Sequence, residues 1–244
     1  MYLRSLEILR GTDTDPMSYP FSIPAVKSLK KLAFRSNVTF LVGENGSGKS
    51  TLLEAIAYQS GFNTAGGGKN NYYDVDASHS ILGEHVRLSW LPKITNGFFL
   101  RAETFYHFAS HLDTLPESLK YYGGRSLHEQ SHGEAFLSLF KHRFGKKAIY
   151  LLDEPEAALS PARQLALMRV IKDLEHEAQF IIATHSPILL GFPDAQIINF
   201  DVQPVEEIQY EDTLHYIITR RFLENRKAVL KDLFDDSDER VMDE

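Results

Sequence analysis

The sequence predicts an α/β fold built around a mainly parallel central sheet. Three apolar runs of strand length, at residues 38–42, 148–152 and 179–183, alternate with segments that have helical spacing. Buried parallel strands have this continuous apolar pattern because helices cover both faces of the sheet. A chain of 244 residues can form one large core, with or without an inserted lobe. We therefore expect a single domain over residues 1–244.

The composition excludes several classes of protein. The chain has no cysteine, which rules out disulfides and thiolate metal sites. Its start lacks a signal-peptide pattern, and no apolar run approaches the roughly 20 residues that span a bilayer. We therefore expect a cytoplasmic protein without membrane contact. The net charge is −7, and residues 231–244 are rich in acids, which predicts a flexible acidic tail. Basic clusters at residues 27–35 and 141–147 are interpreted as solvated surface rather than as a nucleic-acid track.

A glycine-rich loop directly follows the first apolar run, and residues of helical character follow the loop at 52–57. Glycines let successive backbone N–H groups point into one hollow, and the next helix places its positive end beneath it. We expect the lysine to reach the β- and γ-phosphates of a nucleotide and the serine hydroxyl to ligate Mg²⁺. The alternative is a glycine-rich turn with an incidental lysine. The residues of this phosphate-binding pattern, G-x-x-x-x-G-K-[ST], are Gly43, Glu44, Asn45, Gly46, Ser47, Gly48, Lys49, Ser50 and Thr51.

The remaining segments follow in chain order. Prolines interrupt residues 16–24, which favours short strands and turns in an N-terminal antiparallel β portion. Glycine and asparagine fill residues 61–71 and predict a loop that opens an inserted helical lobe of about 62–140. Inside that lobe, residues 97–103 are typical of a core strand. Helical spacing at 164–177, and a helix pair at 212–234, complete the expected elements.

Two acids end the apolar run at 148–152. Asp153 at a strand end can hold Mg²⁺ beside the loop serine, and Glu154 can activate or orient an attacking water. The alternative for Glu154 is an ordinary surface acid. His185 follows the next apolar run, and ligands of parallel sheets collect at the carboxyl ends of strands. His185 is therefore a candidate to contact the γ-phosphate or the attacking water, although many histidines are structural.

A last element precedes the acids. Ser131, His132, Gly133 and Glu134 form a helix capping box, and the simplest interpretation is a well-started helix. A serine and a glycine at a helix N-terminus can also form a second anion site. Because one nucleotide does not need two such sites from one chain, this pattern indicates a site shared between two chains.

The order and spacing of these elements resemble the ATP-binding-cassette (ABC) class of ATPases, over most of residues 35–200. The segment from Asp153 to Pro161 is more similar to the RecF, Rad50 and OLD-like branch than to transporter subunits. That branch includes small ATPases associated with DNA repair and anti-phage systems. The resemblance implies ATP and Mg²⁺ as cofactors and hydrolysis of ATP. It also implies a homodimer that closes around two ATP molecules, each lying between one chain's phosphate loop and the other chain's Ser131 and Gly133.

The sequence departs from this pattern in several places. His132 stands where many relatives carry glycine, and Ser160 stands where transporters carry aspartate. No glutamine lies at the position of the glutamine loop, for which Glu103 is our candidate metal-contacting residue. The spacing between Lys49 and Ser131 leaves no room for long coiled-coil arms, and the segment after His185 is too short for a nuclease domain. We therefore expect an ATPase head without an attached effector domain.

Three functions are compatible with the sequence. The leading hypothesis is an ATP-driven dimerisation switch for a separate effector protein, with nucleic acid contacted through that partner. The second is the ATP-binding subunit of an ABC transporter, and the third is a nucleotide-binding module without turnover. Tyr19, Phe21 and Phe34 are candidates to stack on adenine, although ordinary core aromatics are the favoured interpretation.

Overall fold

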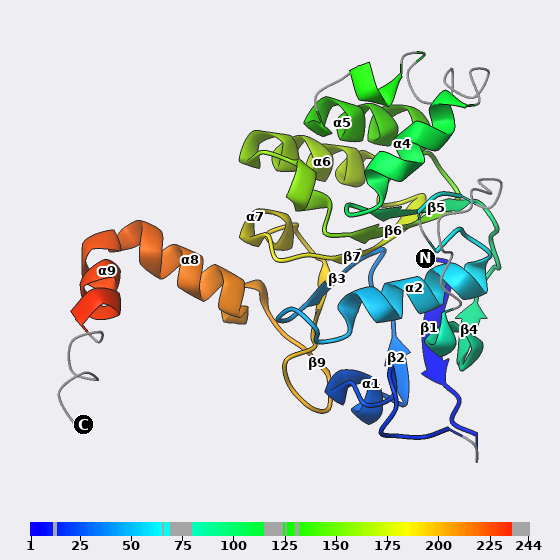
Figure 1. Ribbon diagram of the computed structural model, residues 1–244, viewed down its shortest axis with the longest axis horizontal. Helices are drawn as coiled ribbons and strands as arrows, with labels where there is room; N and C mark the ends of the chain where they lie inside the picture. The colour runs from blue at the N-terminus through cyan, green and yellow to red at the C-terminus, as the bar shows by residue number, and fades with distance from the viewer. Residues whose placement is uncertain are drawn as a thin grey trace.

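Figure 1 shows a computed structural model of the protein. It describes residues 1–11, 14–64, 66–68, 80–114, 124, 126–129 and 132–235. Ser131 lies outside the described residues, as do residues 236–244 of the expected acidic tail and residues 65 and 69–71 of the expected glycine-rich loop.

The central sheet is mainly parallel, as the sequence predicts. Among the described residues it has six strands in the order β5-β6-β7-β3-β8-β9, and only β9 runs antiparallel to its neighbour. The strands β3, β6 and β7 are buried along their whole length, because helices or a second sheet cover both faces. The bounds of the six strands are β3 Val38–Val42, β5 Gly97–Arg101, β6 Ala148–Asp153, β7 Ala178–Ala183, β8 Gln196–Asn199 and β9 Glu206–Glu207.

A smaller antiparallel sheet packs beside the central sheet. Its described strands are β1 (Leu3–Ile8), β2 (Lys31–Ala33) and β4 (Val86–Trp90), in the order β2-β1-β4. The buried Gln179 of β7 joins the two sheets, because its Oε1 accepts from the Leu3 N–H and its Nε2 donates to the Leu3 carbonyl. The expected N-terminal antiparallel portion is therefore confirmed.

Two separate hydrophobic clusters fill the two faces of the central sheet. One contains the buried side of α2 (Lys49–Ser60) together with the antiparallel sheet. The other contains α4 (Phe105–Asp113), α5 (His132–Arg143) and α6 (Pro161–Leu174). Figure 1 shows α4, α5 and α6 together on the opposite side of the sheet from α2. The remaining short helices on the body are α1 Pro24–Ser28, α3 Ile81–Glu84, α7 Pro187–Leu190 and the 3₁₀ turns η2 Leu127–Glu129, η3 Pro155–Ala158 and η4 Tyr210–Asp212.

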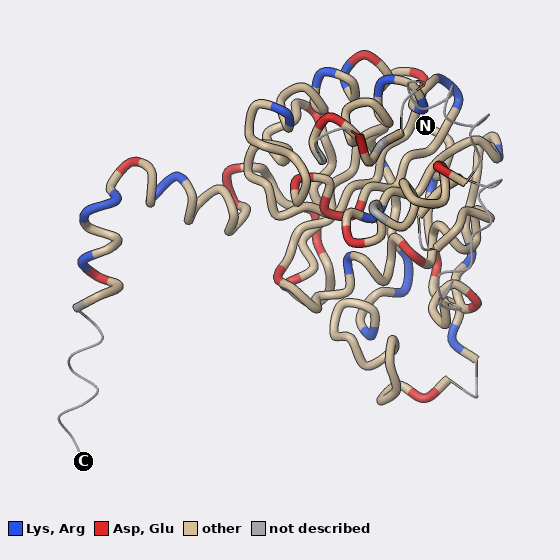
Figure 2. Tube along the Cα trace, turned by 45° about the horizontal axis from the view of Figure 1, so that its top comes forward, with Lys and Arg blue, Asp and Glu red and all other residues tan. Residues whose placement is uncertain are grey.

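The last two helices, α8 (Leu214–Glu224) and α9 (Arg226–Asp235), project from the body as an arm (Figure 1). Figure 2 shows basic and acidic residues alternating along this arm and interspersed over the body. The arm also carries large apolar side chains that are exposed: Leu214, Ile217, Ile218, Phe222, Leu223, Leu233 and Phe234. The helix pair expected near the C-terminus is confirmed.

Turns occupy residues 16–23, as expected, and α1 begins at Pro24, because a missing N–H is tolerated in the first turn of a helix. Two expectations need correction. Within the segment expected as a helical lobe, β4 instead belongs to the antiparallel sheet, whereas β5 confirms the core strand expected at 97–103. The acidic segment starts as helix, because α9 continues to Asp235.

Within the described residues, no helix combines the length and the apolar character that a membrane crossing requires.

Candidate nucleotide-binding site

The glycine-rich loop connects β3 to α2, the arrangement that the sequence predicts. Gly43 and Gly48 have φ values of 147° and 103°, which L side chains rarely adopt. A Cβ at Gly43 would also lie 2.9 Å from the Asp201 carboxylate. No side chain caps the start of α2, so its first N–H groups are available to an anion. Glycine at these positions lets the backbone itself form the anion cradle.

Asp201 forms a hydrogen bond to the backbone of the glycine-rich loop. Its Oδ1 accepts from the Glu44 N–H at 2.7 Å, although Asp201 follows β8, far along the chain. This residue was missed by the sequence analysis, because no local pattern distinguishes it from other turn acids.

Lys49 lies inside the loop, with 4% of its surface exposed. Its Nζ donates to the backbone carbonyls of Gly43 at 2.6 Å and Glu44 at 2.9 Å. Burial lowers the pKa of the Lys49 ammonium, and the nearby carboxylates, first Glu154 and then Asp201, raise it. The ammonium is thus held at the cradle, where phosphate oxygens can replace the carbonyls as acceptors.

Ser50 and Asp153 meet as a metal site requires. The Ser50 hydroxyl donates to Asp153 Oδ1 at 2.9 Å, which brings the start of α2 to the end of β6. Burial raises the pKa of Asp153 to about 6, against the opposing effects of the Ser50 hydrogen bond and the Arg101 charge. Among the described residues there is no group of three or more histidines and acids that could hold a metal by itself.

Arg101, at the end of β5, is the second residue that the sequence analysis missed. Its guanidinium lies 3.6 Å from Asp153 Oδ2, 3.3 Å from Glu54 Oε2 and 3.7 Å from Glu103 Oε2. A half-buried cation among three carboxylates offsets their mutual repulsion and favours their charged forms. The only available signal was an arginine ending a core strand next to the strand of Asp153.

The elevated pKa of Asp153 leads to a stability prediction. Because the folded protein binds this proton more tightly than the unfolded chain, ionising Asp153 lowers the free energy of unfolding as pH rises from about 4 to 6. Asp153→Asn removes that penalty and keeps an oxygen that accepts from Ser50. We expect the variant to gain up to about 3 kcal/mol at pH 7.5 without nucleotide or Mg²⁺, at ~1.36 kcal/mol for each pKa unit.

Urea unfolding at pH 7.5 and pH 4 measures this effect. The gain should disappear near pH 4, where Asp153 is protonated in the wild-type protein. Asp212→Asn, at an exposed residue of η4, serves as the control and should leave stability unchanged at both values. An Asp153→Asn protein that is less stable than wild type at pH 7.5 would contradict the assigned cause.

Glu154 and His185 face one another across the end of the sheet. Glu154 has φ 51°, a left-handed conformation that is unfavourable for glutamate and is found mainly at functional sites. Its Oε1 lies 3.6 Å from His185 Nε2. Burial lowers the pKa of His185, an effect that Lys49 and His215 strengthen and that Glu154 opposes. The neutral imidazole and the carboxylate thus lie on the same side of the site as Lys49.

Glu156 holds the backbone of His185 in place. Its buried carboxylate accepts from the His185 N–H at 2.6 Å, and burial raises the pKa of Glu156. The structure therefore gives the third acid of this segment a positioning contact.

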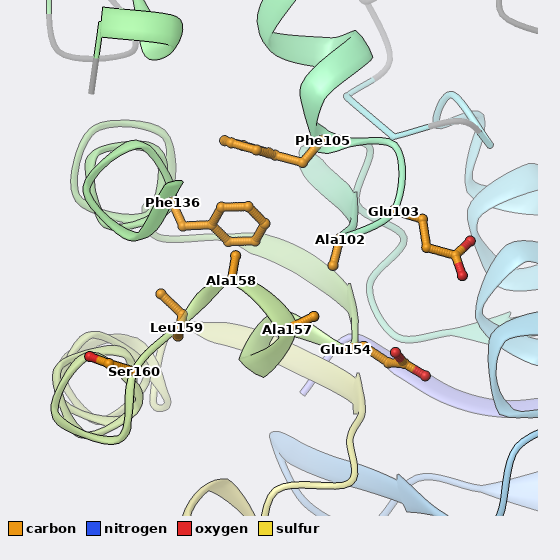
Figure 3. Close-up of a pocket in the computed structure, with 9 residues that line it drawn as sticks. All are labelled: Ala102, Glu103, Phe105, Phe136, Glu154, Ala157, Ala158, Leu159 and Ser160. Atoms are coloured by element: carbon orange, nitrogen blue, oxygen red, sulfur yellow. The ribbon is translucent and has the colours of Figure 1, made fainter. Parts of the chain in front are cut away.

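Glu103 lies beside the metal position, in a small cleft that it shares with Ser50, Asp153 and Glu154. Its side chain is 78% exposed, and its Oε2 lies 3.7 Å from the Arg101 guanidinium. Its role as a metal ligand stays a prediction. Figure 3 shows the carboxylates of Glu103 and Glu154 at one end of a cavity of about 640 Å³, and the rings of Phe105 and Phe136 at the other.

The predicted signature element starts α5. Ser131 lies outside the described residues, and Gly133 is buried against the Arg163 side chain, which a Cβ at this position would displace. Arg163 also pairs with Glu134 at 3.7 Å. The roles of Ser131 and Gly133 toward a nucleotide stay predictions.

Two of the three adenine candidates belong to the core. Phe21 and Phe34 are buried in the cluster around α2, as the favoured interpretation has it. Tyr19 is 64% exposed, and its hydroxyl lies 3.4 Å from Thr51 Oγ1 at the start of α2. Tyr19 therefore remains a candidate to contact the base.

The residues present fit ATP with Mg²⁺. The loop offers backbone donors and the Lys49 charge, and the buried Ser47 hydroxyl has no hydrogen-bond partner among the described residues. Ser50 and Asp153 would hold the cation. When bound, Mg²⁺ would neutralise charge on the phosphate oxygens, and Glu154 would accept a proton from the attacking water.

Two protein-family models match the chain. Residues 18–88, which contain the phosphate loop, match a family described as "AAA domain". Residues 126–191, which contain Asp153, Glu154 and His185, match a family described as "AAA domain, putative AbiEii toxin, Type IV TA system".

Two curated relatives are ATP-binding proteins of importers. The hemin import ATP-binding protein HmuV of Vibrio anguillarum is 28% identical over 169 residues, which cover 60% of this chain and 63% of that protein. The xylose import ATP-binding protein XylG of Moorella thermoacetica is 27% identical over 175 residues, which cover 62% of this chain and 35% of that protein. The chain thus spans less than two thirds of the length of either relative.

A solved structure shares the fold. It is titled an inward-facing conformation of "a putative metal-chelate type ABC transporter", with a TM-score of 0.51 and 15% identity over 89% of this chain and 88% of that one. At this identity the likeness concerns the fold alone. The chain therefore has the fold of ABC-type ATPases, and it matches AAA-domain families on both sides of its candidate nucleotide site.

Proposed function

We propose that the chain is an ATP-hydrolysing head that dimerises around two ATP molecules and acts as a switch for a separate effector or nucleic-acid-processing partner. One observation carries the hydrolytic part of this proposal. Lys49, the Ser50–Asp153 pair and the Glu154–His185 pair all lie at the carboxyl ends of neighbouring parallel strands. This arrangement provides a phosphate cradle, a metal position and a water-activating carboxylate in one site.

The proposal of a shared site is supported by the positions of α2 and α5, which pack on opposite faces of the sheet. The phosphate loop begins α2, whose apolar side chains belong to one hydrophobic cluster. The helix α5, which begins beside Ser131, buries Ala135, Phe136 and Leu139 in the other cluster. Because the sheet separates these helices, the first turn of α5, which holds Gly133, is better placed to meet the nucleotide of a second copy than that of its own chain.

A separate effector is supported by the arm. Exposed apolar side chains on projecting helices are a common feature of protein contacts. The family that matches residues 126–191 bears a toxin–antitoxin description, which favours a protein partner over a transported solute.

The second candidate is the ATP-binding subunit of a transporter. It is favoured by the two curated relatives, both of which are named import ATP-binding proteins. The segment Ser131-His132-Gly133-Glu134 argues against it, because the family resemblance implies a Ser-Gly-Gly-Gln-like signature for transporter subunits. Recovery of the native protein with a membrane-embedded partner would support this candidate, and recovery with a non-membrane effector would support the first.

Mixing two inactive variants tests the shared site. Lys49→Ala removes the phosphate contact of one chain, and Ser131→Arg places a bulky cation in the signature of the other. In a mixed dimer, one composite site carries both defects and the other carries neither. We expect ATPase activity to return on mixing, to roughly a quarter of wild type if the chains exchange at random and one intact site can act alone.

Dimerisation must be measured alongside activity. If both sites must act together, a mixed dimer with one intact site would show no ATPase activity. In Glu154→Gln protein, ATP should produce dimers by light scattering, while ADP should not. Ser131→Arg should prevent these dimers, and the matched control Ser89→Arg, on the exposed side of β4, should not. Absence of both complementation and ATP-dependent dimers would refute the shared site.

A further inference from the structure

His185 has a second hydrogen-bond partner on a distant segment. Its Nδ1 lies 2.9 Å from His215 Nε2, which belongs to the first turn of α8. The other nitrogen of His185, Nε2, faces Glu154 Oε1 at 3.6 Å. The His185 ring therefore lies between the water-activating acid and the base of the arm.

The position of His215 is fixed by bonds to the segment that follows His185. The Tyr210 hydroxyl donates to the Pro187 carbonyl at 2.9 Å, and the buried Thr213 hydroxyl donates to the Tyr210 carbonyl at 2.7 Å. Thr213 Oγ1 also accepts from the Tyr216 N–H at 3.4 Å and so caps the start of α8. The two imidazoles are therefore held together by connected parts of the chain.

The geometry also assigns the protons. A hydrogen bond between two neutral imidazoles needs one N–H donor and one bare nitrogen. If His185 donated through Nδ1, its bare Nε2 would direct a lone pair at the Glu154 carboxylate. If His215 donates through Nε2, His185 carries its proton on Nε2 and directs an N–H toward Glu154, which is electrostatically favourable. Burial lowers the pKa of both histidines, which favours the neutral pair.

His185 Nε2 is itself unusual. It is buried and has no hydrogen-bond partner among the described residues, although its proton would point into the site. A buried donor without a partner is unfavourable unless a ligand supplies the acceptor. The terminal phosphate of ATP, or the attacking water beside Glu154, is an acceptor of the required kind.

We propose that His215 is a positioning residue that holds His185 as the Nε2–H tautomer, directed at Glu154 and the terminal phosphate. This inference rests on the proposed ATPase function of the site, and it goes further by placing the first turn of the arm in hydrogen-bond contact with the hydrolytic residues.

Two substitutions at His215 distinguish the effect of its N–H donor from the effect of its side-chain volume. His215→Ala removes the donor, whereas His215→Gln can place an amide N–H near the position of the imidazole Nε2. In ¹⁵N-histidine-labelled protein, the ring-nitrogen shifts of His185, assigned by their loss in His185→Gln, report the tautomer. We expect the Nε2–H form in the wild type and in His215→Gln, and a mixture of tautomers in His215→Ala. His176→Ala, at an exposed residue between α6 and β7, is the control and should leave the His185 signals in place.

Turnover supplies the second measurement. Loss of one positioning hydrogen bond should lower kcat about 5- to 30-fold in His215→Ala with little change in ATP affinity, and His215→Gln should recover most of it. An unchanged His185 tautomer in His215→Ala, or equal loss of kcat in both variants, would overturn the proposal. If the wild-type protein lacked ATPase activity, the proposed function would fail, and the nuclear magnetic resonance result would still decide the role of His215.

Discussion

Glu154→Gln should bind ATP with nearly wild-type affinity and hydrolyse it about 10²–10⁴-fold more slowly. The substitution removes the carboxylate that can accept a proton from water, while Lys49 and the Ser50–Asp153 pair stay in place. Phosphate release under single-turnover conditions measures the chemical step, and calorimetry with Mg²⁺–ATP measures binding.

The control for this experiment is Glu206→Gln, on the exposed edge strand β9, which makes the same chemical change away from the site. It should leave both rates and affinity unaltered. A Glu154→Gln protein that keeps nearly wild-type turnover would show that another group activates the water. Because His185 Nε2 lies 3.6 Å from Glu154, the His185→Gln protein would then be the next variant to measure.

Lys49→Ala should weaken ATP binding by about 30- to 4,000-fold. Truncating one partner of a buried charged pair costs about 2–5 kcal/mol, and each 1.4 kcal/mol is a tenfold change in affinity. In this site the loss is large, because Lys49 is the loop's own cation and its Nζ is already directed at the cradle.

Calorimetry at fixed Mg²⁺ measures this loss, and Lys30→Ala, at an exposed residue before β2, is the matched control. The variant should remain folded, because removing a buried ammonium also removes its desolvation penalty. Unchanged ATP affinity in a folded Lys49→Ala protein would mean that the loop does not hold the β- and γ-phosphates.

The comparison of sequence and structure separates local from long-range information. The glycine loop and the acids after β6 are local features, because backbone conformation at a glycine or the end of an apolar strand depends on adjacent residues. The sequence therefore predicted the Lys49 cradle, and it placed Asp153 and Glu154 at the strand end. The core strand expected at 97–103 is confirmed as β5, but the expected helical lobe was less accurate, because β4 pairs with β1, which lies far away in the chain.

Burial also separated candidates that look equivalent in the sequence. Tyr19, Phe21 and Phe34 are all aromatic residues before the loop, yet only Tyr19 is exposed beside Thr51. Phe21 and Phe34 are buried because α1 and β2 pack against the cluster around α2. Aromatic character alone cannot distinguish a core side chain from a ligand contact.

The sequence by itself thus determined the class of fold, the phosphate loop and the identity of the acids, since each depends on a short run of residues. Only the tertiary structure revealed that Arg101 lies among the carboxylates of the metal site and that Asp201 holds the loop. It alone placed His215 against His185. These contacts join segments from separate strands and from the arm, and a hydrogen bond between distant residues depends on how the sheet brings strand ends together rather than on any local pattern.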